Sequence, residues 1–349
     1  KSMALTSDRT GILIINLGTP DSPSTLHVRR YLREFLSDPR VIDIPGLLRF
    51  FLLNFIILPL RPARSAEAYR KIWTNEGSPL LIHTRDLSLA LARHLPRVSV
   101  KFAMRYGSPS IPDVMKEFAK EGVRKIKVLP LYPQYAAAST ASTSARVYEC
   151  AASMNDPLEV EMLGPFFDHD GFLDATAHLA RPFLASAKGA HVLFSYHGVP
   201  ERQIDRSVRS GLSHADQDHC SFGDCCHSPG DRLALCYRAQ CFSTTKGLVS
   251  RLQLKQEDYS IGFQSRLGRT PWVRPYTDEL IQTLPARGVK HLAVICPSFV
   301  SDCLETLEEI QIRAKEDFLR AGGESFVYIP CLNSDETWVK AVARMVEGE

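Results

Sequence analysis

Short apolar runs rich in β-branched residues recur along the chain, and each is followed by Gly, Pro or another small residue. Continuous runs of this kind are typical of parallel strands that are covered on both faces. Stretches with helical spacing, such as Ile111–Glu121 and Thr277–Arg287, lie between them. This alternation predicts an α/β fold with doubly wound parallel sheets. The clearest of the expected strands are Gly11–Leu17, Val98–Ala103, Lys125–Leu131, Val192–Tyr196, Tyr259–Gln264 and His291–Pro297.

The two halves of the chain repeat one another. The segment Ile12–Pro20 is similar to Val192–Pro200, since both are apolar strands that end in a Gly followed two residues later by Pro. Glu121–Ile126, which leads into a strand, parallels Ala286–His291. Internal repetition predicts two similar Rossmann-like domains.

We expect the N-terminal domain to span 1–160 and the second to span 161–325, with a hinge near 155–165 and the segment 326–349 packing back on the first domain. In open α/β sheets, ligands bind beyond the carboxyl ends of the strands. The sequence therefore predicts a ligand cleft between the two domains.

Composition and charge narrow the function. Lys and Arg number 42 against 39 Asp and Glu, a balance that argues against a protein that binds nucleic acid along its surface. No run reaches about 18 uninterrupted apolar residues, which argues against a transmembrane helix. The N-terminus lacks an apolar signal core, and we take Met3 as the natural start. We expect a cytoplasmic protein. The first strand ends without a phosphate-binding glycine motif, so nothing supports a nucleotide site.

His197 ends a predicted strand and is followed by Gly198. The glycine allows close approach of a ligand, and imidazole at a strand end can take up a proton or ligate a metal near neutral pH. The alternative is an ordinary loop histidine held by hydrogen bonds. We retain His197 as a candidate base.

A second strand end leads into Asp302, Glu305 and Glu309. We expect a helix that starts near Ser301 or Asp302 as N-cap, with the three carboxylates on one helix face. Acidic residues in the first turn of a helix often only cap it and interact with the helix dipole. This explanation is weaker for Glu309, because that residue lies one turn further along. A carboxylate face together with an imidazole predicts a divalent-metal site or a proton-transfer pair.

The segment 46–60 is strongly apolar, because ten of the twelve residues from Leu47 to Leu58 are hydrophobic. A buried core helix and a lip that dips into a membrane are both compatible with this pattern. Arg61 and Arg64, which follow directly, would lie at the headgroups in the second case.

Nine cysteines are unlikely to form structural disulfides in a reducing cytosol. Cys150, Cys296, Cys303 and Cys331 are scattered and are expected to be buried as small apolar residues. The other five lie in a stretch of 22 residues that belongs to a polar insert, 214–241. Their spacing differs from a paired C-x2-C zinc ribbon and favours a 2Fe-2S cluster, with zinc as the alternative. These are Cys220, Cys225, Cys226, Cys236 and Cys241, of which one of the neighbours Cys225 and Cys226 is expected to be spare.

Several motifs in the same order resemble the ferrochelatase family, of a bacterial type with an internal cysteine cluster. The most specific are Leu193–Arg202, Gln264–Trp272 and Pro297–Glu309. The resemblance implies a chelatase-type fold with a porphyrin cleft. It also implies a metal-chelatase lyase that inserts ferrous iron into protoporphyrin IX to form protohaem, the terminal step of haem biosynthesis.

By the same resemblance, His197 and Glu305 would handle metal delivery and proton removal, and Glu309 would extend the acidic path for the iron. Phe299, Trp272, Tyr132, Tyr106 and Arg105 would line the macrocycle pocket, Leu17 would lie under the ring, and Tyr69, Arg61 and Arg64 would sit near the propionates. Segment 46–60 would form a membrane-facing lip.

Two departures and several alternatives stand beside this interpretation. Cys303 occupies a position where many relatives have His, which leaves metal preference open, and animal members carry their cluster cysteines near the C-terminus. A chelatase for coproporphyrin or for sirohydrochlorin is the nearest rival. A non-catalytic porphyrin carrier or iron sensor is the rival from another class. Peripheral contact with the inner face of the membrane and a homodimer are also left open.

Overall fold

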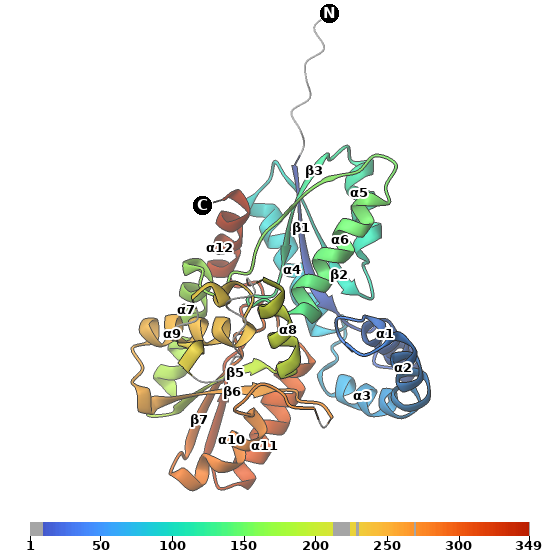
Figure 1. The fold of residues 1–349 in the computed structure, drawn as a ribbon. Coiled ribbons are helices and arrows are strands. Elements are labelled where there is room, and N and C mark those ends of the chain that lie inside the picture. Colours follow the sequence, from blue (N-terminus) through green and yellow to red (C-terminus); the bar gives the residue numbers. More distant parts are fainter. Residues whose placement is uncertain (1–9, 212–223, 228–229, 269, 349) are drawn as a thin grey trace, which may run out of the picture. The chain divides into compact units, whose positions relative to one another are not determined.

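The computed structural model describes residues 10–211, 224–227, 230–268 and 270–348. The chain divides into two compact units, each built on its own parallel sheet (Figure 1). The first comprises residues 1–131, 138–164 and 334–349, and the second comprises 132–137 and 165–333. The first unit thus reaches Gly164, four residues beyond the predicted boundary. Residues 326–333 belong to the second unit.

The first unit holds a four-stranded sheet in the order β2-β1-β3-β4. Its strands are β1 (Thr10–Gly18), β2 (Ser99–Tyr106), β3 (Lys125–Pro130) and β4 (Glu159–Met162). Its helices are α1 (Thr25–Ser37), α2 (Gly46–Phe51), the π-helix η1 (Leu52–Ile57), α3 (Leu58–Ile72), α4 (Pro79–His94), α5 (Ile111–Lys120), α6 (Ser142–Ala152) and α12 (Glu336–Glu347). The π-helix η2 (Ala137–Ala141) leads into α6.

Apolar side chains from both faces of this first sheet are buried. Leu13, Ile15, Ile126 and Val128 pack with Phe118 of α5 in one core cluster. On another side, α4 packs on β1 and β2, and α12 packs on α4. The C-terminal helix therefore belongs to the first unit although the preceding strand belongs to the second.

The second unit repeats the topology with the order β6-β5-β7-β8. Its strands are β5 (His191–His197), β6 (Tyr259–Gln264), β7 (His291–Ile295) and β8 (Ser325–Tyr328). Its helices are α7 (Asp170–Ser186), α8 (Glu201–Gly211), α9 (Tyr237–Leu252), α10 (Thr277–Thr283), the π-helix η8 (Glu305–Ala314) and α11 (Lys315–Arg320). Short 3₁₀ turns lie at η4 (Asp224–Cys226), η5 (Gly230–Ala234), η6 (Gln256–Asp258) and η7 (Pro285–Arg287).

The shared strand order confirms the predicted α/β class and the similarity of the two halves. Both sheets are wholly parallel within the described residues, and both place the first strand of the unit second in the order. In each unit the loops after the central strands therefore emerge at one sheet edge.

Candidate active site

His197 is the last residue of β5 and is half-buried. Its Nδ1 lies 2.6 Å from the carbonyl oxygen of Gly198. Because a carbonyl oxygen can only accept a hydrogen bond, Nδ1 carries a proton, and in the neutral imidazole Nε2 then keeps its lone pair. The imidazole is therefore held in the tautomer that can accept a proton at Nε2.

The backbone around His197 leaves room for nothing larger than glycine at the next position. A Cβ on Gly198 would lie 2.8 Å from the carbonyl oxygen of Gln264 and 3.1 Å from the ring of Trp272. The loop after β6 thus packs closely on the loop after β5, where Val273 donates to the carbonyl of Val199. At Gly198 the structure shows a close approach of the protein's own Gln264 backbone and Trp272 ring, and the approach of a ligand there stays a prediction.

Glu309 is held by the residues that end β6. The backbone N–H of Ser265 donates to Oε1 at 2.8 Å, and the Ser265 hydroxyl donates to Oε2 at 2.5 Å. Ser265 has a φ of 64°, a left-handed conformation that is uncommon for a residue with a side chain and that clusters at functional sites. Burial raises the pKa of Glu309, and the two Ser265 hydrogen bonds and the charge of His197 oppose that shift.

Gln264 ties the two carboxylate residues to the strands. Its Oε1 accepts from Ser195 at 2.8 Å, which fixes the orientation of the amide. Its Nε2 then donates to the backbone carbonyl of Glu305 at 2.9 Å and faces Glu309 Oε2 at 3.4 Å. Since Gln264 pairs with His197 in the sheet register, one buried amide links β5, β6 and the π-helix η8.

Glu305 begins η8 and is half-buried near Cys303, whose thiol pKa is raised by burial and by the Glu305 carboxylate. A π-helix closes i→i+5 hydrogen bonds, so residues four apart lie almost in line along it. Glu305 and Glu309 are therefore successive carboxylates on one line. Within the described residues, no three His, Cys, Asp or Glu side chains form a ready-made metal site.

The expectation for Asp302 is wrong. It is neither N-cap nor part of the helix, whose first residue is Leu304. Its buried carboxylate instead accepts from the Asn333 amide at 2.8 Å, from Thr306 at 3.1 Å and from Tyr328. Asp302 therefore braces the turn before η8, and only Glu305 and Glu309 share a helix face.

Phe299 and Trp272, two other predicted residues of the second unit, lie near His197. The Phe299 ring stands edge-on to the His197 imidazole, with centroids 6.1 Å apart. Trp272 donates from Nε1 to the carbonyl of Leu267 at 2.9 Å. Tyr132 is buried. Phe299 and Trp272 are half-buried aromatic surfaces next to the histidine.

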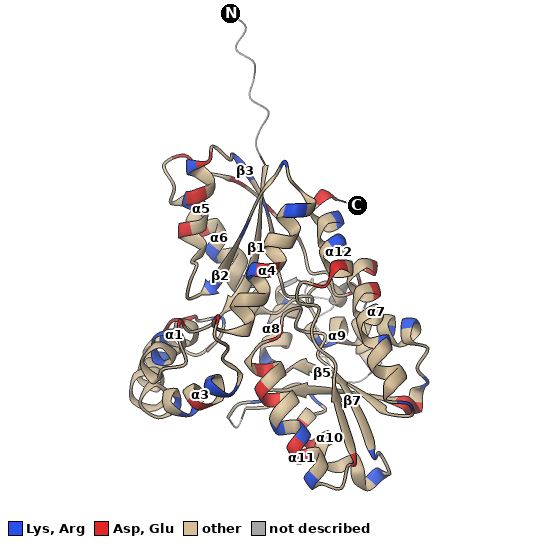
Figure 2. Cartoon of the chain, turned by 180° about the vertical axis from the view of Figure 1, so that it is seen from behind, with Lys and Arg blue, Asp and Glu red and all other residues tan. Residues whose placement is uncertain are grey.

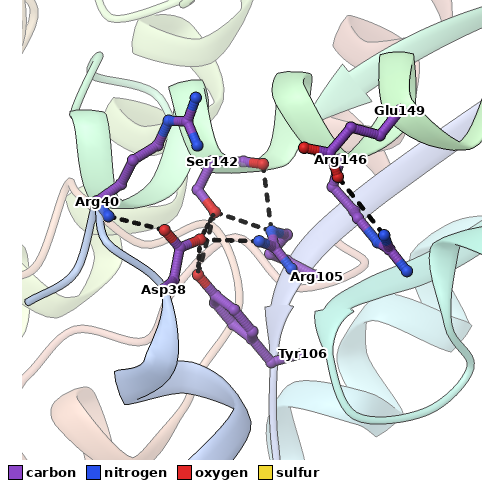
Figure 3. Close-up of polar contacts among 7 residues, drawn as sticks. All are labelled: Asp38, Arg40, Arg105, Tyr106, Ser142, Arg146 and Glu149. Carbon is purple, nitrogen blue, oxygen red and sulfur yellow. Dashed lines mark hydrogen bonds and ion pairs between the residues drawn. The ribbon is translucent and has the colours of Figure 1, made fainter. Parts of the chain in front are cut away.

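In the first unit, Arg105 and Tyr106 share a buried carboxylate that the sequence analysis overlooked (Figure 3). Asp38 Oδ2 accepts from Arg105 Nη2 at 2.8 Å, from the Tyr106 hydroxyl at 2.9 Å and from the Ser142 hydroxyl at 2.5 Å. Burial would raise the pKa of Asp38, but hydrogen bonds from Ser142, the Arg40 backbone and Tyr106, with the Arg105 charge, lower it.

The guanidinium of Arg105 and the hydroxyl of Tyr106, both predicted to line the pocket, are thus hydrogen-bonded within this network. Tyr106 is 1% exposed, and the Arg105 guanidinium lies over its ring at 4.3 Å. Their predicted role as pocket walls stays a prediction, while their role in holding α1, β2 and α6 together is visible.

The remaining predicted residues of the first unit lie at β1 and on the long helix. Leu17 is half-buried near the carboxyl end of β1. Tyr69 is buried and contacts Trp73 edge-on. Arg61 is partly buried and Arg64 is exposed. Burial, together with the charge of Arg64, lowers the pKa of Arg61.

The apolar segment is a helix that runs without a break through α2, η1 and α3, from Gly46 to Ile72. By length and composition this helix could cross a membrane, although the absence of an uninterrupted apolar run argued against one. Leu53 and Leu58 are buried, and α3 packs on α1. Most other apolar residues are exposed, so a buried core helix is excluded. They include Leu47, Leu48, Phe50, Phe51, Phe55, Ile56 and Leu60, which are 50% to 74% exposed.

The cysteine segment is described in part. Cys220 lies outside the described residues. Cys225 and Cys226 lie on η4, Cys236 is the N-cap of α9, and Cys241 is fully buried in α9. Arg238 Nη1 donates to Cys226 Sγ at 2.8 Å. Cys150, Cys296, Cys303 and Cys331 are buried, as predicted.

Sequence reasoning missed the residues that hold the others in place: Asp38, Ser142, Tyr237, Gln264 and Ser298. Ser298 accepts from the backbone N–H of His197 at 2.9 Å, and Tyr237 donates to the His197 carbonyl at 2.7 Å. Gln264 and Ser298 lie beside predicted strand ends, which was the available signal. Asp38 and Tyr237 had none.

Comparison with known proteins agrees with the motifs. A model of the ferrochelatase family matches residues 9–349. The chain is 42% identical to a ferrochelatase of Pseudomonas putida over 337 residues, 96% of this chain and 98% of that one. It is 45% identical to a ferrochelatase of Pseudomonas aeruginosa over 335 residues, 96% of each chain.

The fold also resembles a solved chelatase. The structure of SirB from Bacillus subtilis with Fe³⁺ matches with a TM-score of 0.51 at 11% identity, over 97% of this chain and 94% of that one. This likeness supports the chelatase-type fold, and the sequence matches decide the family. The chain belongs to the ferrochelatase family.

Proposed function

We propose that this protein is a metal-chelatase lyase that inserts ferrous iron into protoporphyrin IX to form protohaem, the terminal step of haem biosynthesis. One arrangement carries the proposal. At the paired carboxyl ends of β5 and β6, the imidazole of His197 is held by a backbone carbonyl, Glu309 is fixed by Ser265 and faces Gln264, and Glu305 precedes Glu309 on the same π-helix line. Membership of the ferrochelatase family supports the substrates.

Iron insertion replaces two pyrrole N–H protons by one Fe²⁺ ion, so two protons must leave while the iron stays ferrous. In the proposal His197 Nε2 accepts a pyrrole proton. Glu305 and Glu309 bring in the cation and take up protons. The raised pKa of Glu309 suits a carboxyl that binds and releases protons closer to neutral pH.

The macrocycle needs apolar walls and cationic partners for its two carboxylates. We propose that Phe299 and Trp272 pack on the ring near His197, with Leu17, Tyr132, Tyr106 and Arg105 as further walls. Arg61, Arg64 and Tyr69 would bind the propionates.

Replacing Glu305 by Gln is expected to lower kcat for anaerobic iron insertion by at least about 100-fold, because the amide neither attracts Fe²⁺ as a charge nor accepts a proton. Porphyrin affinity, followed by fluorescence quenching, should change by less than about threefold. Glu316→Gln, an exposed acid further along the same helical run, is the control and should keep wild-type rates. A Glu305→Gln enzyme with near wild-type turnover would show that the metal path lies elsewhere.

We propose further that the exposed apolar part of the helix, residues 47–60, docks on the inner face of the cytoplasmic membrane. Between Thr25 and Ile72 the chain carries nine Lys or Arg against four Asp or Glu, so this region is more basic than the whole chain. Figure 2 shows basic residues along α1 and α3. Exposed apolar residues beside basic ones are typical of helices that lie in an anionic lipid surface.

A triple replacement of Phe50, Phe51 and Phe55 by Ser tests this docking. Wild-type protein should float with vesicles of phosphatidylglycerol, and the triple variant should bind at least about tenfold less tightly, since three rings no longer enter the interface. Leu89→Ser removes a leucine that is 54% exposed on α4 and should leave binding unchanged. Equal flotation of wild type and triple variant would contradict membrane docking.

For the cysteine segment we propose a 2Fe-2S cluster, with ligands drawn from Cys220, Cys236, Cys241 and one of Cys225 and Cys226. The described residues supply donors of the right kind. The Arg238 guanidinium beside Cys226 would stabilise a thiolate at that cysteine. Burial raises the pKa of the Cys241 thiol, so this cysteine would become a thiolate ligand only when a metal binds it. The cluster would hold the segment together or sense iron. It would take no part in iron insertion, in which the iron stays ferrous.

Purified protein is then expected to be coloured, with absorbance between roughly 400 and 600 nm and about two iron atoms per chain. Cys236→Ser should lose both colour and iron. Cys150→Ser removes a buried thiol from the first core and should keep them. Single replacements of Cys225 and Cys226 identify the spare residue. A colourless protein that holds stoichiometric zinc would refute the iron–sulfur cluster.

A further inference from the structure

The start of α9 connects two features that lie far apart in the sequence. Three consecutive residues, Cys236, Tyr237 and Arg238, are all buried there. Cys236 is the N-cap of the helix, Tyr237 reaches the backbone of His197, and Arg238 reaches Cys226. All of these residues lie in the second unit.

Tyr237 and Ser298 together hold the His197 backbone on both sides of the residue. The Tyr237 hydroxyl donates to the His197 carbonyl at 2.7 Å, and the Ser298 hydroxyl accepts from the His197 N–H at 2.9 Å. The two hydroxyls are themselves 3.3 Å apart. The peptide group that Tyr237 fixes joins His197 to Gly198, and the Gly198 carbonyl is the partner of His197 Nδ1. Tyr237 therefore acts on the groups that set the position and tautomer of the imidazole.

The same tyrosine also contacts the cysteine segment. Cys241 lies one turn further along α9, where its thiol and the Tyr237 hydroxyl shift each other's pKa, although burial is the larger cause of both raised values. Arg238 joins the next residue of the helix to Cys226 at 2.8 Å and to the carbonyl of Arg274 at 3.2 Å.

We propose that Tyr237 is a positioning residue for His197, and that it makes the orientation of this histidine depend on the state of the Cys225–Cys241 segment. A buried helix start whose neighbouring side chains are fixed at both ends cannot shift at one end without moving the other. Ligation, oxidation or loss of order at the cysteines would therefore change the hydrogen bonds of His197. The inference rests on the role proposed above for His197.

The chain offers a matched pair of tyrosines for the test. Tyr237→Phe removes the hydroxyl that holds the His197 carbonyl. Tyr196→Phe removes the hydroxyl of another buried tyrosine, whose partner is Thr245 at 2.7 Å. In the intact enzyme, Tyr237→Phe is expected to lower kcat about tenfold, the effect of one lost hydrogen bond, with KM for porphyrin within about twofold. Tyr196→Phe should keep kcat within about twofold of the wild type.

A readout that needs no turnover separates position from activity. In protein labelled with ¹⁵N-histidine and free of porphyrin, the His197 ring should show a protonated Nδ1 and an unprotonated Nε2, assigned by the loss of its signals in His197→Gln. Tyr237→Phe should shift these signals toward a mixture of tautomers, and Tyr196→Phe should not. Unchanged His197 signals in Tyr237→Phe would overturn the positioning role, whatever the activity of His197 variants.

Arg238→Lys tests the connection to the cysteines while leaving every thiol and Tyr237 in place. It breaks the bond to Cys226 and should shift the His197 ring signals in the same direction as Tyr237→Phe. In the Tyr237→Phe background the same change should add nothing, because the route to His197 is already cut. Additive shifts in the double variant, or none in Arg238→Lys alone, would overturn the connection.

Discussion

Replacing His197 by Ala is expected to lower kcat for iron insertion by about 1,000-fold, the usual contribution of a positioned general base. In the neutral imidazole Nε2 keeps a lone pair that can accept a pyrrole proton, because Nδ1 donates to the Gly198 carbonyl. Porphyrin affinity should fall by less than about threefold, since the ring keeps its aromatic walls. Stopped assays of protohaem formation under anaerobic conditions, with fluorescence titration of porphyrin, measure the two quantities separately.

His191→Ala is the matched control. His191 begins the same strand β5, and its Nε2 lies 2.8 Å from the Ser260 hydroxyl. Its removal should leave turnover unchanged, because it lies at the opposite end of the strand. Near wild-type turnover in His197→Ala would show that another group removes the pyrrole protons.

Replacing Asp38 by Asn is expected to lower the free energy of unfolding by about 3 kcal/mol, the cost of breaking a buried ion pair by removing one partner. The Arg105 and Asp38 side chains are 14% and 5% exposed, and Tyr106 and Ser142 lose their charged acceptor as well. Urea unfolding followed by circular dichroism provides the measurement, with the unfolding of the first unit analysed as a separate transition if two appear.

A surface pair provides the comparison. Arg124 and Asp156 are also ion-paired, but their side chains are 58% and 72% exposed. Asp156→Asn should cost less than about 1 kcal/mol. Equal effects of the two replacements would contradict the importance assigned to the Asp38 network.

The Asp38 network also predicts a pH dependence. The pKa of Asp38 is lower in the folded protein than its ordinary value of about 3.9. Its contribution to stability is therefore fully present above that ordinary value and is lost as the pH falls through the folded pKa. The stability of wild type should decline more steeply in acid than that of Asp38→Asn. Parallel acid profiles would contradict the lowered pKa.

The central strands could be predicted from sequence because they are continuous apolar runs, and the six expected strands are all present within a few residues. The missed strands, β4 and β8, are the edge strands of their sheets and only four residues long. In β4, Glu159 and Glu161 alternate with Val160 and Met162, so no apolar run marks it. Edge strands of this kind carry little sequence signal.

Candidate site residues could be predicted where titratable side chains lie at or just after the ends of predicted strands. The role of a residue could not be predicted where its hydrogen-bond partners are distant in the sequence. His197 ends an apolar strand and Glu305 and Glu309 come soon after another, so the sequence marked these positions, but it did not mark Gln264, Ser298 and Tyr237, which hold them. Asp302 looked like a helix cap from its neighbours, but its partners Asn333 and Tyr328 lie about 30 residues further along. Asp38 and Tyr237 gave no local signal, because their roles arise only from packing with other elements.

The most direct test of the account is anaerobic insertion of ferrous iron into protoporphyrin IX and, separately, coproporphyrin III, followed in the porphyrin spectrum. The account predicts multiple turnovers with protoporphyrin IX and slower turnover with coproporphyrin III. Preference for coproporphyrin III would contradict the proposed substrate. Tight binding of both porphyrins without insertion into either would contradict catalysis itself and leave a porphyrin carrier.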